Sequence, residues 1–181
     1  MKKIVMFFSA LLVVGTASIN AQNLYSTHTG QIKFYASTPL ENVEAVNNEV
    51  ESKMLQKNGQ IIFAVLIQGF HFANALMQDH FNENYMESTK YPKADFKGYI
   101  TNIASVNFSK DGKYNITGEG DLTIHGVTKK INTTGFLEIA GGKVSINSVF
   151  KIDLKDFKVT GSYIGTKIAE QVQVTVDCKY D

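Results

Sequence analysis

Apolar and polar residues alternate with a period of two through most of this chain, and that alternation restricts its fold more than any other feature. Ile32, Phe34 and Ala36 share one phase, and the segments 144–154 and 168–180 alternate in the same way. A period of two is typical of strands that bury one face. Short turns such as Gly141-Gly142 join these segments, which predicts strands that pair in sequence as an antiparallel meander.

About eight such segments follow one another, and they predict an all-β fold. A meander of this size hides its edges best by closing on itself, so we expect an antiparallel eight-stranded up-and-down barrel. Such a barrel has room for packed side chains or for one elongated ligand. The alternative is a membrane barrel with its apolar face outward. It is disfavoured because the opposite phase carries charges that suit water, among them Lys151, Asp153 and Asp177.

One segment, residues 72–92, breaks the alternation and predicts a helical insert around 73–90. Met77, Phe81 and Tyr85 are spaced to lie on one helix face. The strand before it, residues 60–71, is apolar on both faces, and we expect the insert to cover one of them. The insert is then either a plain core-capping helix or a lid that touches bound ligand through Met77, His80, Phe81 and Tyr85.

The amino terminus has the pattern of a secretory signal, with Lys2-Lys3, a short apolar run and a small residue at Ala21. We expect cleavage near Ala21, one domain over residues 22–181, and a periplasmic or secreted location. The apolar run is too short to span a bilayer. The formal net charge of +1 disfavours a nucleic-acid partner. The sole cysteine, Cys178, excludes an intramolecular disulfide.

Catalytic and metal-binding patterns are weak in this sequence. Asp79 and His80 are adjacent, so on a helix they point about 100° apart and do not face each other as a dyad would. The histidines at positions 28, 71, 80 and 125 are scattered, without metal-ligand spacing. We therefore expect no catalytic residues, no metal and no cofactor, and we keep a metal-assisted hydrolase as the least favoured alternative.

Three segments resemble the YceI-like family of polyisoprenoid-binding, lipocalin-like barrels. They are Gly120-Asp-Leu-Thr-Ile-His-Gly-Val-Thr-Lys129, the stretch from Asp79-His80-Phe81 through Lys90-Tyr-Pro92 to Phe96, and Phe150-Lys-Ile-Asp-Leu-Lys-Asp-Phe157. The resemblance implies a barrel with a helix in its long connection and an apolar lumen that holds an isoprenoid or other long-chain amphiphile. It also implies periplasmic residence and no catalytic residues. The arginines that the family carries near its Asp-x-His-Leu stretch are absent here, which favours a neutral or less charged lipid over a pyrophosphate.

The sequence thus favours a non-enzymatic carrier, scavenger or storage protein for such a lipid. A ligand-free structural or interaction barrel, dimeric through the doubly apolar strand, is the second hypothesis. If the other face of residues 60–71 points inward, Ile62, Leu66 and Phe70 replace the residues chosen from that strand. The predicted lumen residues are Phe34, Phe63, Val65, Ile67, Val106, Phe108, Ile116, Leu122, Ile124 and Phe150.

Overall fold

The structure is a computed structural model that describes residues 24–181, so the predicted signal peptide lies outside the described residues. One short helix, α1, and the π-helical turn η2 interrupt a run of strands. The strands are β1 (Leu24–Ser37), β2 (Asn42–Leu55), β3 (Gln60–Leu66), β4 (His71–Phe72), β5 (Lys93–Ile100), β6 (Gly112–Ile124), β7 (Val127–Ala140), β8 (Lys143–Asp153) and β9 (Gln171–Tyr180). The helical elements of the insert are α1 (Ala75–His80) and η2 (Phe81–Tyr85).

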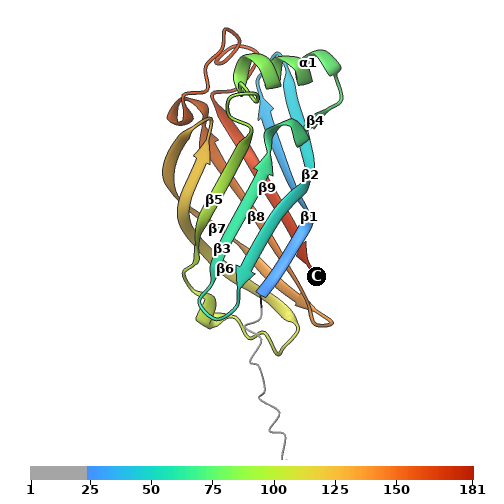
Figure 1. The fold of residues 1–181 in the computed structure, drawn as a ribbon, viewed down its shortest axis with the longest axis vertical. Coiled ribbons are helices and arrows are strands. Elements are labelled where there is room, and N and C mark those ends of the chain that lie inside the picture. Colours follow the sequence, from blue (N-terminus) through green and yellow to red (C-terminus); the bar gives the residue numbers. More distant parts are fainter. Residues whose placement is uncertain (1–23) are drawn as a thin grey trace, which may run out of the picture.

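The long strands close into the predicted eight-stranded antiparallel barrel. Neighbours follow the order β1-β9-β8-β7-β6-β5-β3-β2, and pairing of β1 with β2 closes the ring. The two-residue strand β4 adds a short pairing with β2 near one end. Figure 1 shows a tall barrel of tilted strands, with both the carboxyl terminus and the start of β1 toward the lower end. Closure leaves no long strand with an unpaired edge, which is the advantage expected of a barrel.

The residues of β3 that point into the barrel are those that the sequence predicted to do so. Ile61 and Val65 are buried inside the barrel, whereas Ile62 and Leu66 are 37% and 47% exposed on its outer wall. Of the two apolar faces, one of which the insert was expected to cover, this outer one stays open to solvent. Phe70 is nevertheless buried, because the 3-10 turn η1 (Ile67–Gly69) shifts the phase of the chain after β3.

Side chains close the lower end of the barrel. They come from a segment that the sequence pattern predicted to be part of a strand. The period-two pattern predicted a strand from Ala94 to Phe108, but β5 ends at Ile100. Asn102 explains the difference, because its side chain takes over the hydrogen bonds that the backbone ladder would make. Its Nδ2 donates to the Asn115 carbonyl (2.9 Å), and its Oδ1 accepts from the Thr117 N–H (2.9 Å). Phe108 then stacks on Tyr25 at a ring separation of 5.8 Å, which helps to close the base.

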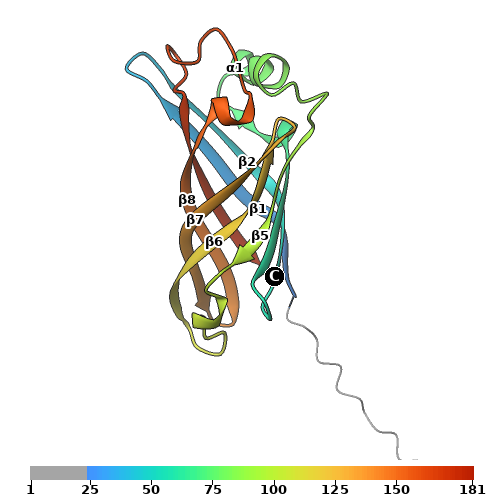
Figure 2. The same cartoon turned by 90° about the vertical axis from the view of Figure 1, so that its left-hand side faces the viewer.

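The insert lies across the upper end of the barrel (Figures 1 and 2). Asn74 begins the helix as its N-cap, with Oδ1 accepting from the backbone N–H groups of Leu76 (2.9 Å) and Met77 (3.3 Å). Together α1 and η2 form an eleven-residue helix over 75–85, within the predicted 73–90. The chain leaves this helix through Glu87, which has a left-handed φ of 43°. The insert thus covers the upper opening of the barrel.

Candidate ligand-binding site

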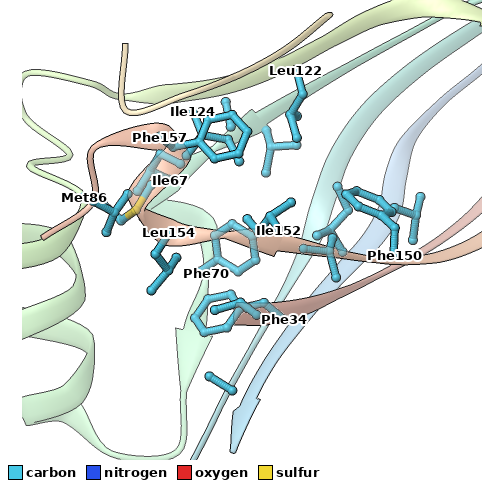
Figure 3. Close-up of a pocket in the computed structure, with 18 of the residues that line it drawn as sticks. Phe34, Ile67, Phe70, Met86, Leu122, Ile124, Phe150, Ile152, Leu154 and Phe157 are labelled. Carbon is cyan, nitrogen blue, oxygen red and sulfur yellow. The ribbon is translucent and has the colours of Figure 1, made fainter. Parts of the chain in front are cut away.

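A cavity of about 530 Å³ runs through the upper and middle barrel, and its wall is almost entirely apolar (Figure 3). The floor is formed by the branched side chains Ile61, Ile100, Ile116, Ile146 and Val176. Gly118 on β6 and Gly135 on β7 are among the lining residues, and they contribute no side chain to the cavity. Its volume falls within the range of about 300–1,000 Å³ that is usual for small-molecule sites.

Eight of the ten predicted lumen residues line this cavity. They are Phe34, Phe63, Val65, Ile67, Ile116, Leu122, Ile124 and Phe150. The other two, Val106 and Phe108, do not, and the structure corrects their placement: both lie in the connection below β5 and pack into the sealed base. They were chosen because their phase matched a strand that the structure ends at Ile100.

All four residues chosen from the insert, Met77, His80, Phe81 and Tyr85, also line the cavity. Phe81 lies at the centre of an aromatic cluster at the upper end. Its ring centroid is 5.4 Å from that of Phe34, 5.8 Å from Phe70 and 5.0 Å from Phe72. The insert is thus joined to β1 and to the segment after β3 by ring contacts above the cavity, and such contacts stabilise beyond simple burial.

A second apolar cluster completes the cap, and sequence reasoning missed it as part of the site. Phe157, in the 3-10 turn η4 (Leu154–Phe157), packs with Met86, Leu122 and Ile67. Figure 3 shows Phe157, Met86 and Ile67 together at one end of the lining residues. The motif that ends in Phe157 could have indicated this residue, because it was one of the segments that resemble the family. Other lining residues that were missed include Phe72, Ile152, Leu154 and Val159, and Phe70 was named only as an alternative.

The mouth of the cavity lies among α1, the β1–β2 connection and the loop 158–170. Tyr85 packs against this loop so closely that a Cβ on Gly161 would collide with its ring. Burial, helped by the nearby Tyr163 hydroxyl, raises the pKa of Tyr85, so its phenol stays neutral at ordinary pH. Lys167 also lines the cavity here, with its Nζ 5.1 Å from the Tyr163 ring centroid. Polar and charged groups therefore gather at the entrance.

Side chains that could ligate a metal are dispersed in the described part of the chain. Within residues 24–181, no three His, Cys, Asp or Glu side chains lie close enough together to hold a metal ion. In the same residues, no helix is both long and apolar enough to cross a membrane. His80 lies in the cavity lining, whereas His125 contacts Glu87 outside it, so the structure does not bring these two histidines into one site.

A closed antiparallel barrel with a helix-capped apolar cavity has the architecture of the lipocalin-like class of binding barrels. Comparison with known families gives the particular one. The YceI-like domain matches residues 15–180, almost the whole chain, and the protein belongs to this family. No match was found among curated proteins.

Solved structures with the same fold include three relatives of low sequence identity. A polyisoprenoid binding domain from Saccharophagus degradans, implicated in plant cell wall breakdown, has a TM-score of 0.76 at 12% identity and covers 87% of this chain and 97% of its own. BcnA of Burkholderia cenocepacia has a TM-score of 0.66 at 19% identity, with 84% and 96% covered. The YCEI protein of Campylobacter jejuni has a TM-score of 0.55 at 16% identity, with 100% and 99% covered.

Proposed function

We propose that this protein is a non-enzymatic binding protein of the periplasm that holds an isoprenoid or another long-chain amphiphile in its barrel. The observation that carries the proposal is the continuous apolar cavity of about 530 Å³ beneath the insert. Burial of apolar chain contributes about 0.8 kcal/mol per methylene, so a long chain gains enough free energy to bind without specific polar contacts. Family membership and the resemblance to a polyisoprenoid binding domain support the same class of ligand.

The charges at the mouth favour a neutral or singly charged head group. Among the described residues that line the cavity, Lys167 is the one lysine or arginine, and the carboxylate of Glu41 lies in the same lining. A pyrophosphate would require several cationic donors to replace its hydration. A fatty acid requires one cationic donor, which Lys167 provides, and a neutral lipid requires none.

The periplasmic location rests on the signal pattern at residues 1–21. It also agrees with the chemistry, because an apolar ligand needs a carrier to cross an aqueous compartment between membranes. The role as carrier, scavenger or store depends on the source and the destination of the lipid.

Native mass spectrometry of protein purified without detergent from its own cell envelope tests the proposal. The expected result is a mature chain that starts near residue 22 and carries one lipid, which organic extraction then identifies. A chain that carries no lipid, and that also takes up none from added fatty acid, would favour the ligand-free structural barrel instead. Recovery of a pyrophosphate lipid would contradict the inference about the head group while leaving lipid binding intact.

A further inference from the structure

Two hydroxyl groups interrupt the apolar wall near the floor of the cavity. They belong to Thr133 on β7 and Ser148 on β8, and both residues line the cavity. The other polar lining residues belong to the mouth or, like Asp95 and Thr134, occupy the outward phase of their strands. Threonine and serine at these inward positions are unexpected where valine would suit a strand at least as well.

The hydrogen bonds of this pair leave one acceptor available. Thr133 Oγ1 and Ser148 Oγ lie 2.8 Å apart, and Ser148 Oγ also donates to the Thr134 carbonyl at 2.9 Å. Thr133 Oγ1 lies farther from that carbonyl, at 3.4 Å, so the shorter bond assigns the carbonyl to the Ser148 proton, and the Thr133 hydroxyl then donates to Ser148 Oγ. A hydroxyl has one proton and two lone pairs, so the lone pairs of Thr133 Oγ1 have no donor among the described residues.

Each hydroxyl residue pairs with a glycine across the sheet, so no side chain of that partner covers it. Gly118 is the partner of Thr133 on β6, and Gly135 is the partner of Ser148 on β7. Both glycines line the cavity. Gly135 in turn pairs with Ile116, so the hydroxyls stand at about the level of the floor. A ligand that reaches the floor therefore meets the pair directly.

We infer that Thr133 and Ser148 form a polar subsite that binds a hydroxyl group on the buried end of a long-chain ligand. The inference rests on the proposed lipid-binding function and adds a preference to it. The ligand hydroxyl donates to Thr133 Oγ1, and this bond replaces one that the hydroxyl makes to water. The subsite thus accepts amphiphiles that carry a single hydrogen-bonding group at the end that enters first, which a wholly apolar floor would reject.

The length of the cavity identifies a suitable probe. From Ile116 to Ile124 the chain advances eight residues at about 3.3 Å each, and a strand tilt of about 40° gives roughly 20 Å of depth, which suits a chain of about sixteen carbons. A carboxylate avoids the floor, because no cation lies there to compensate its desolvation. It stays at the mouth near Lys167, so the distal end of a hydroxylated fatty acid reaches the hydroxyl pair.

The test compares dissociation constants of hexadecanoic acid and 16-hydroxyhexadecanoic acid, measured by displacement of a fluorescent fatty acid. The proteins are the wild type, Thr133→Val, and the double variant Thr133→Val, Ser148→Ala. Thr123→Val is the matched control, because Thr123 Oγ1 lies 2.8 Å from Thr128 Oγ1 in a similar pair on the outer wall. The single variant is nearly isosteric and keeps the test valid if the double variant folds poorly.

In the wild type and in the control, the two acids are expected to bind within about threefold of each other. In the double variant the hydroxylated acid should bind about tenfold more weakly than the plain acid, because its hydroxyl is then buried without a partner. The same ratio in all the proteins would overturn the subsite while lipid binding stands. A wild type that binds neither acid would overturn the proposed function, and the subsite with it.

Discussion

The imidazole of His125 is hydrogen-bonded to the carboxylate of Glu87, with 2.8 Å between Nε2 and Oε2. His125 lies in the turn between β6 and β7, and Glu87 follows the helix of the insert, so the pair fastens the cap to the barrel rim. Both residues adopt a left-handed backbone, with φ of 51° and 43°. The His125 ring also packs edge-on against Tyr91, at 4.5 Å between centroids. This contact joins the segment 79–96 to the segment 120–129, two of the segments that resemble the YceI-like family.

Replacing His125 with asparagine, which tolerates a positive φ, should lower the free energy of unfolding by about 1–2 kcal/mol. The substitution removes a partly buried polar contact and the packing on Tyr91. It should also speed the release of bound fatty acid, because the insert is less firmly held. Chemical denaturation and stopped-flow displacement measure the two effects. The control is His28→Asn, since His28 and Glu51 form an exposed pair at 3.6 Å that contributes little. Equal effects of the two substitutions would contradict this role.

Gly126, the next residue, should be intolerant of any side chain. Its φ of 73° is left-handed, and a Cβ would lie 2.6 Å from Cε1 of Tyr91. Gly142 provides a matched control, because its φ of 78° is similar but a Cβ there would meet nothing within 4 Å. Gly142→Ala should therefore lose about 1 kcal/mol from backbone strain alone. Gly126→Ala should lose at least 1 kcal/mol more by urea denaturation, and equal losses would show that Tyr91 moves aside easily.

The barrel could be predicted because period-two alternation reports directly on which face of a strand is buried. That pattern placed Phe34, Ile116, Leu122 and Phe150 correctly on the inner wall. It failed where local hydrogen bonding overrides the pattern, as at Asn102, which ends β5 and moves Phe108 to the base.

The cap was harder to predict than the barrel, because it depends on contacts between distant segments. Phe157, in η4, belongs to the cap because it packs in one cluster with Met86 and Ile67, which are distant in the sequence. Nothing local to Phe157 indicates those partners. The size of the cavity was equally hidden, since it depends on how the inward side chains of several strands pack together.

Replacing Phe81 with alanine should weaken lipid retention more than folding. Phe81 contacts three other rings above the cavity but is itself only partly buried. We expect a loss of about 2 kcal/mol in unfolding free energy, below the 3–5 kcal/mol typical of a fully buried phenylalanine, and release of lipid at least tenfold faster. Phe136→Ala is the control, because Phe136 lies on the outer wall beneath Lys113. Retention and stability that fall in proportion would assign Phe81 to the core alone.

Stability should decline at alkaline pH because two buried acids resist ionisation. Burial, with a smaller contribution from Asp177, raises the pKa of Cys178 from 9.0 to about 12, and burial likewise raises the pKa of Tyr180. Above about pH 9 the unfolded thiol loses its proton while the folded thiol keeps it, so the unfolded state is favoured. The contribution of the Cys178 thiol to the free energy of unfolding is therefore fully present below pH 9. It is lost at up to about 1.4 kcal/mol per pH unit until about pH 12.

Denaturation midpoints measured at intervals above neutral pH check this decline. Cys178→Ala should show a shallower fall above about pH 9, because the buried thiol no longer contributes. The variant is expected to be less stable at neutral pH, since it leaves a small cavity, so the comparison depends on the slope and not on the starting value. Identical slopes in the two proteins would mean that Cys178 ionises as easily in the folded barrel as in the unfolded chain.

Substituting phenylalanine for Ile116 should shorten the cavity from its floor. Ile116 lines the floor of the cavity, and the next inward residue above it on β6 is Gly118, which has no side chain, so a larger ring can extend upward. Loss of room for about two methylenes costs about 1.6 kcal/mol, roughly a fifteenfold weaker affinity for hexadecanoic acid. Dodecanoic acid, which ends above the floor, should bind almost unchanged. Ile62→Phe on the outer wall is the control and should alter neither affinity. If Ile116→Phe weakened both acids equally, the ligand would not reach the floor along this axis.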